Sequence, residues 1–441
     1  MTFDYIFKNN NMNLKKLLPF LLIAFSTFVF SQEQTTQVKF YGFVSNEFYF
    51  NSRQNVDLVD GVILLFPKPT TINAAGADVS ATPQAEMLSV NSRLGMDING
   101  TPILGAKSSG KIEADFAGTG STFFILRLRQ AYVKLNWNKT ELLLGQTWHP
   151  LFGNVAPTTP SSNGGAPFQP FNRSPQLRVK QSLTKTLSVT AAALYEMQYA
   201  SIGPSSVSAT NIYMKNAIAP DLFIGLENKT THWTTGAGID YKTLKPDATN
   251  SATISSLSAT AYTQYVNNKL LIKAKVIYGE NLSDQLMLGG YGVSKYGTGA
   301  DSAKVLGYTS FKNGNAWINA VYGSKIQFGL LLGLSQNLGS KDDLALNPKT
   351  KKFANYGYGF YDNSDLNGTL KAGNAGYLDQ QILDRLYRIA PHVSYNLPNL
   401  KFALEYDFTT ANYGILKTNG TAHDSYTVSN NRVLASVSYI F

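Results

Sequence analysis

Apolar and polar residues alternate along most of this chain, in segments of about ten residues. The first clear segment is KFYGFVSNEFYF (39–50). In LSVNSRLGMDI (88–98), five aliphatic side chains share one face, opposite Arg93. A period of two is typical of β-strands, whose successive side chains point to opposite faces. In KSSGKIEADF (107–116), one face collects the charged residues Lys107, Lys111, Glu113 and Asp115.

The pattern predicts about sixteen strands joined by connections of alternating length. Tight turns such as WNKT and VNNK alternate with four long stretches, 51–86, 148–173, 281–314 and 338–383. Short turns at one end and long loops at the other are typical of an up-and-down transmembrane barrel. Besides 39–50, 88–98, 107–116 and 125–137, strands are expected to begin near residues 140, 175, 187, 220, 232, 253, 269, 315, 325, 384, 400 and 430.

The N-terminus has the pattern of a secretory signal peptide. Lys15 and Lys16 precede an apolar run of 14 residues, 17–30, which is too short to span a bilayer. We expect cleavage after Ser31, with Met12 as a possible true start. The mature chain, 32–441, is then expected to form one domain. After residue 31 no run of 18 apolar residues occurs, so no transmembrane helix is expected.

The last segment, NRVLASVSYIF, ends on Phe441 and is apolar at every second position before it. Such a C-terminal strand is the kind of signal that the outer-membrane barrel assembly machinery recognises, although an edge strand of a soluble protein could look the same. In hydrocarbon an unpaired backbone group costs several kcal/mol, so a sheet there must close. The sequence therefore predicts an all-β fold, a transmembrane antiparallel barrel in the bacterial outer membrane, in contact with lipid and lipopolysaccharide.

A barrel in lipid turns its apolar faces outward and its charges inward, which explains a mean hydropathy of only -0.13. Removing residues 1–31 takes away three lysines and one aspartate, which leaves 35 basic and 27 acidic residues. In an exported protein this excess of positive charge favours small anions or acidic headgroups as partners over nucleic acid.

The strand ILRLRQAYVKLNW (125–137) changes its apolar face midway. Up to Arg129 the even positions are apolar, and from Ala131 onward the odd ones are. An arginine facing lipid at mid-membrane would cost roughly 2–4 kcal/mol, so Arg127 and Arg129 should face the lumen. Keeping Lys134 there too requires one extra residue near Arg129, a β-bulge. Alternatively, the slip lies at the membrane rim, where orientation costs little.

Other charged residues are expected to line the same lumen. Some of the arginines should simply pair with the carboxylates, and the remaining positive charge should attract anions. The expected pore-lining residues are Arg93, Lys111, Glu113, Asp115, Arg127, Arg129, Lys134, Arg178, Lys180, Arg385 and Arg388.

The stretch 148–173 contains five prolines, which favour a compact excursion over a continued strand. We expect it to fold into the barrel and narrow it; the alternative is an exposed loop. His149 is expected to be a packing or rim residue, because the four histidines show no metal-ligand spacing. The chain has no cysteine and no G-x-S-x-G, HExxH or P-loop motif, so we expect neither an enzyme nor a cofactor.

Four blocks, NSRLGMDI (91–98), GKIEADFAG (110–118), LRLRQAYVKL (126–135) and LLLGQTWHPLF (142–152), resemble the DcaP-type porins of Gram-negative outer membranes, which are associated with dicarboxylate uptake. The blocks cover about the first third of the mature chain. The resemblance implies a homotrimer of sixteen-stranded barrels with an arginine-lined constriction. The matching charged residues are Arg93, Glu113, Asp115, Arg127 and Arg129.

The chain departs from that family in two ways. About six residues separate the expected cleavage site from the first strand, which leaves no room for the helical extension of better-known members. Gln130 stands where a histidine would be expected. We therefore expect an outer-membrane porin for passive diffusion of small anionic solutes, such as dicarboxylates, through a basic-lined constriction. A phosphate- or sugar-selective porin and a non-conducting structural or adhesin barrel remain as alternatives.

Overall fold

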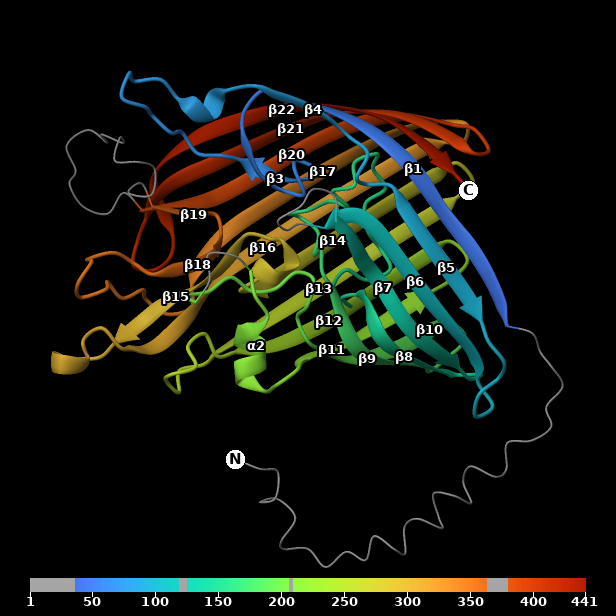
Figure 1. Cartoon of the computed structure of the whole chain (residues 1–441), viewed down its shortest axis with the longest axis horizontal. Helices are drawn as coiled ribbons and strands as arrows, with labels where there is room; N and C mark the ends of the chain where they lie inside the picture. The colour runs from blue at the N-terminus through green and yellow to red at the C-terminus, as the bar shows by residue number, and fades with distance from the viewer. Residues whose placement is uncertain (1–35, 119–124, 206–208, 363–379) are drawn as a thin grey trace, which may run out of the picture.

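The structure is a computed structural model that describes residues 36–118, 125–205, 209–362 and 380–441. The predicted signal peptide lies outside the described residues. Within them, sixteen long strands form one closed antiparallel sheet, which wraps around a common interior (Figure 1). In order around the wall, the strands are β1 (Gln37–Asn51), β5 (Arg93–Asn99), β6 (Lys107–Gly118), β7 (Ile125–Asn136), β8 (Thr140–Trp148), β9 (Arg173–Ser182), β10 (Leu187–Leu194), β11 (Asp221–Lys229), β12 (Trp233–Leu244), β13 (Ile254–Asn267), β14 (Leu270–Glu280), β16 (Val305–Gly323), β17 (Ile326–Ser340), β20 (Gln380–Asn396), β21 (Leu400–Leu416) and β22 (Ala422–Ile440).

Pairing between the first and last strands closes the sheet. Strand β1 pairs with β5 along one edge and with β22 along the other. At the end of the chain, Gly42 and Phe441 exchange two backbone hydrogen bonds, of 3.0 and 3.1 Å. Every barrel strand therefore has two neighbours, and the backbone groups of a sheet edge are satisfied, as hydrocarbon surroundings require.

The long connections carry the remaining elements. Strand β4 pairs with the far end of β1, β15 pairs with both β16 and β18, and β19 pairs with β20, while β2 and β3 form a separate hairpin. These elements are β2 (Asn55–Leu58), β3 (Ile63–Pro67), η3 (Val79–Ala81), β4 (Gln84–Leu88), α2 (Ile212–Ala217), η4 (Ser283–Gln285), β15 (Gly289–Tyr296), η5 (Gly299–Asp301), β18 (Asn355–Tyr358) and β19 (Phe360–Asp362).

The predicted fold class is confirmed, and most strands begin where the alternation places them. The expected starts at residues 140, 187 and 400 coincide with those of β8, β10 and β21. The largest difference is β16, which begins ten residues before the expected position 315. Its first third, from Val305 to Ser310, pairs with β15 in the long-loop region, where no apolar outer face is needed and the alternation is weak.

The outward face of the wall is apolar. On β7, Leu126 and Leu128 are 63% and 48% exposed, whereas the neighbouring Arg129 is buried inside. The same alternation holds on β11, where Leu222 and Ile224 are exposed and Phe223 is buried. This arrangement reverses that of a water-soluble protein, in which apolar side chains are enclosed. No helix among the described residues is both long enough and apolar enough to cross a membrane.

The phase slip in β7 is a β-bulge. Gln130 pairs with Glu113, but Leu128 already pairs with the next residue of β6, Ala114. Arg129 is therefore the additional residue on β7, as the change of apolar face predicted. The bulge keeps Arg127 and Gln130 on the inner side of the same strand although they are three positions apart.

The interior is more filled than the sequence suggests. The hairpin of β2 and β3 was expected to be part of an outer loop, but it enters the barrel, and residues Ile63–Pro67 are all buried. Phe66 belongs to the same apolar cluster as Phe168 of the long connection after β8 and Leu386 of the wall. Two connections thus meet inside the barrel and share an apolar core.

Candidate pore-lining site

Two arginines of β7 bind two carboxylates of β6 in a compact cluster. Arg127 binds Asp115 with both ends of its guanidinium group, Nε to Oδ1 at 2.9 Å and Nη2 to Oδ2 at 2.7 Å. Arg129 bridges the two acids, with 2.8 Å to Glu113 Oε1 and 2.7 Å to Asp115 Oδ2. Charge-assisted contacts of this geometry hold guanidinium groups in fixed positions.

Strand register brings Arg93 to the same cluster. Asp115 pairs with Arg93 on one side and with Arg127 on the other. Arg93 Nε lies 4.0 Å from Glu113 Oε1, and within the described residues this buried nitrogen has no hydrogen-bond partner. Three guanidinium groups against two carboxylates leave one net positive charge. We call Arg93, Arg127, Arg129, Glu113 and Asp115 the arginine cluster.

A cavity of about 180 Å³ lies against the arginine cluster. Its polar wall is made by the three arginines, Asp115 and Asn91, and the facing wall comes from the interior connections. The cavity residues of those connections are Val59, Val62 and Ile63, followed by Phe152, Pro157, Thr159, Ser161, Ser162, Gly164 and Phe171.

Residues 148–173, which we call loop 148–173, contact several strands from inside. Lys275 of β14 donates hydrogen bonds to the carbonyl oxygens of Phe152 at 2.6 Å and Leu151 at 3.3 Å. Asn319 of β16 accepts a hydrogen bond from the backbone N–H of Thr158 at 2.8 Å. These contacts hold the loop within the barrel, away from an exposed position.

Three predicted lysines are on the inner face, each beside a carboxylate. They lie on β6, β7 and β9, and Lys111 also donates to the hydroxyl of Tyr41 at 3.0 Å. Each lysine is paired with one carboxylate, so these three pairs add no net positive charge to the inner face. The pairs are Lys111 with Asp97 (3.0 Å), Lys134 with Glu141 (3.3 Å) and Lys180 with Glu227 (3.0 Å).

Two further predicted arginines face inward but are occupied by protein contacts. Arg178 donates to the carbonyl oxygen of Trp148 at 2.5 Å. Arg388 is 2% exposed and lies 3.0 Å from Asp407 Oδ2, while it also donates to the carbonyl oxygen of Ala166 in loop 148–173 at 2.7 Å. Arg388 therefore holds loop 148–173 inside the barrel.

Arg385 does not join the other predicted residues. It lies on the outer face of β20, exposed beside Tyr387, whose hydroxyl accepts a hydrogen bond from Arg385 Nη1 at 3.1 Å. Arg388 is three positions further along the strand, and an odd spacing places two side chains on opposite faces. The expectation that both arginines line the lumen is corrected for Arg385.

Arg173, which was not among the predicted residues, begins β9 and is fully buried. Its guanidinium carbon lies 4.4 Å from the centre of the Trp148 ring and 5.5 Å from that of Phe171. Within the described residues, Arg173 Nη1 has no hydrogen-bond partner. Cation–π contacts with these rings stabilise the guanidinium group in its buried position. Arg173 lies at the end of a proline-rich stretch without alternation, so the sequence pattern could not predict that its side chain points into the barrel.

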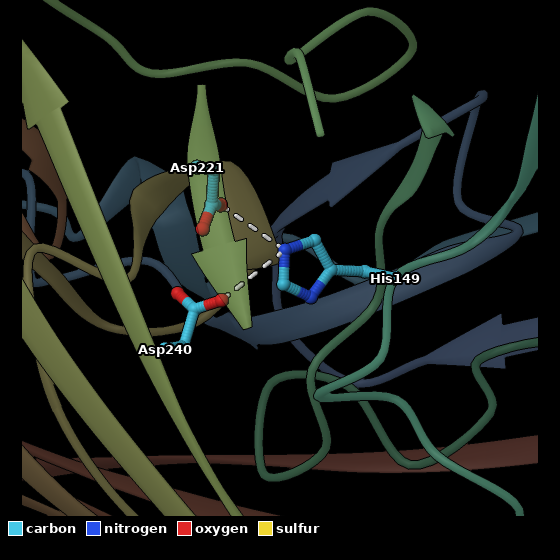
Figure 2. Close-up of side chains that lie close together, drawn as sticks. All are labelled: His149, Asp221 and Asp240. Atoms are coloured by element: carbon cyan, nitrogen blue, oxygen red, sulfur yellow. Dashed lines mark hydrogen bonds and ion pairs between the residues drawn. The ribbon is translucent and has the colours of Figure 1, made fainter. Parts of the chain in front are cut away.

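His149 begins the interior course of loop 148–173 and meets two carboxylates (Figure 2). Its Nε2 lies 3.1 Å from Asp221 Oδ2 and 3.7 Å from Asp240 Oδ1, and all three residues are buried. One imidazole and two carboxylates at this spacing could hold a metal ion. However, His149 Nδ1 accepts the backbone N–H of Leu151 at 3.1 Å.

That hydrogen bond places the proton of a neutral imidazole on Nε2, the atom that faces both carboxylates. Nε2 then donates a hydrogen bond and has no lone pair for a metal. The three residues therefore form a hydrogen-bond network that fixes the start of loop 148–173. His149 is an internal anchor and not a rim residue.

A second buried charge group lies beside this network. Lys242 contacts Asp284 and lies 3.7 Å from Glu196 Oε1. Glu196, in the connection before α2, also accepts hydrogen bonds from the backbone N–H and the hydroxyl of Ser201, at 3.0 and 2.7 Å. Burial raises the pKa of Glu196 to about 7, although the charge of Lys242 opposes this shift.

No protein-family model and no curated protein sequence matches the chain. Among solved structures, the outer membrane channel DcaP of Acinetobacter baumannii is similar with a TM-score of 0.61 and 18% sequence identity, over 93% of this chain and 99% of that chain. The fold is that of an outer-membrane porin.

Two further solved structures share this porin fold. An anion-selective porin from Comamonas acidovorans gives a TM-score of 0.50 at 10% identity, over 92% of this chain and 100% of that chain. A trimer form of OmpT, an outer membrane protein of Vibrio cholerae, gives 0.52 at 12% identity, with the same coverage. At identities of 10–18% these comparisons show a shared porin fold, and they carry no information about the residues that line the interior.

Proposed function

We propose that this protein is a porin of the bacterial outer membrane through which small anions diffuse passively. The observation that carries the proposal is the cavity beside the arginine cluster, where Arg93, Arg127 and Arg129 outnumber Glu113 and Asp115. An excess positive charge next to a narrow, water-accessible space attracts anions and repels cations. No chemical step is part of this role.

Loop 148–173 is proposed to be the constriction of this channel. Its residues form one side of the cavity, and the anchors Lys275 and Arg388 hold it from different parts of the wall. A narrowing fixed in this way would act by size as well as by charge. The solutes it would admit are small carboxylates or dicarboxylates; inorganic phosphate and sugars are the alternatives in the same channel class.

The porin fold and the outward apolar face support a position in the outer membrane, in contact with lipid and lipopolysaccharide. A trimeric assembly and recognition of Phe441 by the barrel assembly machinery belong to the same proposal. The trimer form of a protein with this fold supports the former. The backbone pairing of Phe441 with Gly42 of β1 supports the latter.

A second candidate function is a closed structural barrel. It is favoured by the interior apolar core, in which Phe66 and Phe168 meet wall residues. Purified protein in planar bilayers separates the two functions. The porin shows unitary current steps whose reversal potential in a salt gradient indicates anion preference, whereas a closed barrel gives no current.

A blocking series identifies the solute class within the porin function. Dicarboxylates, phosphate and neutral sugars are added in turn to a single conducting channel. Reduced current with dicarboxylates supports the proposed class, and blocking by sugars alone contradicts it.

A further inference from the structure

The hairpin of β2 and β3, residues 55–67, is built as an interior element. A loop exposed to water would carry polar residues, but the sequence from Val62 to Phe66 is continuously apolar, and both of these residues are at most 3% exposed. We call residues 55–67 the lumenal hairpin. Burying such a strand removes apolar surface from water, which is favourable.

The barrel wall binds the hairpin through its carbonyl oxygens. Arg432 of β22 donates to Gly61 at 2.9 Å, and Tyr413 of β21 donates to Pro67 at 2.6 Å. These donors come from neighbouring strands at one side of the wall, where β3 lies against β21 and β22. The hairpin is therefore attached at both its tip and its end.

Arg388 joins the hairpin to loop 148–173. One of its guanidinium nitrogens donates to the carbonyl oxygen of Leu65 at 3.0 Å, and another donates to that of Ala166 at 2.7 Å. Leu65 and Phe168 also belong to one apolar cluster. The two segments, about a hundred residues apart in sequence, thus form one packed body inside the barrel.

We infer that the lumenal hairpin is a second constriction element, whose tip sets the limiting width of the passage beside the arginine cluster. This inference rests on the porin function proposed above. Val59, Val62 and Ile63 at the tip line the same cavity as Arg93 and Arg129. A cavity of about 180 Å³ has room for roughly six waters, at about 30 Å³ each. The volume of a single side chain at the tip is therefore a large fraction of the cavity volume, so changing that side chain should change the width of the passage.

A single cysteine at the tip tests this inference, because the chain contains no cysteine of its own. In the variant Val62→Cys, a small methanethiosulfonate reagent with an ammonium group is applied while single channels are recorded. Attachment adds bulk and positive charge at the narrowest point, so we expect a stepwise loss of current. The matched control is Val79→Cys in the same connection, where the side chain is 40% exposed and does not line the cavity. Its modification should leave the current unchanged.

A second variant, Val62→Ala, removes two methyl groups and should raise single-channel conductance without any reagent. If the native channel conducts and neither modification at position 62 nor Val62→Ala changes its current, the hairpin inference is overturned while the porin function stands. If neither the native chain nor any variant conducts, both are overturned. Mass spectrometry shows whether the thiol has reacted; where it has not, the conductance of Val62→Ala decides.

Discussion

Glu113 and Arg129 allow the net charge of the arginine cluster to be raised, lowered and restored. Arg129→Gln lowers it from +1 to 0, and Glu113→Gln raises it to +2. The double variant returns to +1 without either charged group. Each change leaves the bidentate pair of Arg127 and Asp115 in place, so the cluster retains its central contact.

The size of the effect follows from the cavity. A space of about 180 Å³ places a permeating ion about 6 Å from the altered charge, where one elementary charge in water is worth about 0.7 kcal/mol. Screening at about 0.1 M salt, with a Debye length of about 10 Å, reduces this to about 0.4 kcal/mol. Since anions and cations respond in opposite directions, their permeability ratio should change by about 0.8 kcal/mol, roughly three- to fourfold.

The assay is the reversal potential of single channels in a salt gradient. Arg129→Gln should reduce anion preference by that factor, Glu113→Gln should increase it, and the double variant should return close to the native value. Higher salt should shrink all three differences. Unchanged ratios in both single variants, with the barrels shown to be folded by their heat-modifiable gel mobility, would refute the electrostatic argument. A double variant that stays far from native would show that the arginine acts through its shape.

Three further outcomes are expected, each measured as the midpoint of heat unfolding in detergent. Lys275→Met removes the donor of two loop carbonyls, so the free energy of unfolding should fall by about 1–3 kcal/mol and the midpoint should fall with it. An unchanged midpoint would contradict the anchoring role. His149→Ala should lower the midpoint by leaving Asp221 without its donor, whereas zinc or EDTA should not move the native midpoint; a zinc-dependent rise would revive a metal site. Glu196 has a folded pKa of about 7, above its unfolded value, so its contribution should be full below about pH 4.5 and lost as the pH rises through 7; Glu196→Gln should flatten this dependence, and an unaltered slope would assign it to another group.

The sequence predicts the wall of this barrel well because lipid imposes a strict alternation on it. The face change in residues 125–137 locates even the bulge at Arg129, since a lipid-facing guanidinium would be costly. The same rule applied to Arg385 and Arg388 would have placed them on opposite faces, because their spacing is three. Both arginines were placed in the lumen because of their charge alone, without regard to the odd spacing that puts them on opposite faces of the strand.

The interior could be predicted only in part. Six apolar residues from Val62 to Pro67 inside a long connection were a visible sign of burial, but alternation says nothing about where such a strand packs. The network of His149, Asp221 and Asp240 joins segments about seventy residues and more apart. Its geometry depends on the curvature of the closed wall, which local sequence patterns do not contain.

The hydrogen bonds between Gly42 and Phe441 have a consequence for the order of folding. They join positions almost four hundred residues apart, so the pairing of β1 with β22 has the largest entropic cost of loop closure in the sheet. We expect these two strands to pair last. At Gly42 an added Cβ would lie 2.8 Å from the Phe441 ring and 2.3 Å from the carbonyl oxygen of Arg93, so the joint admits only a glycine there without displacement. A chain lacking Phe441 would keep the pairs from Phe43–Ile440 to Asn51–Arg432, but the backbone N–H and C=O of Gly42 would lose their partners at the end of the seam between β1 and β22.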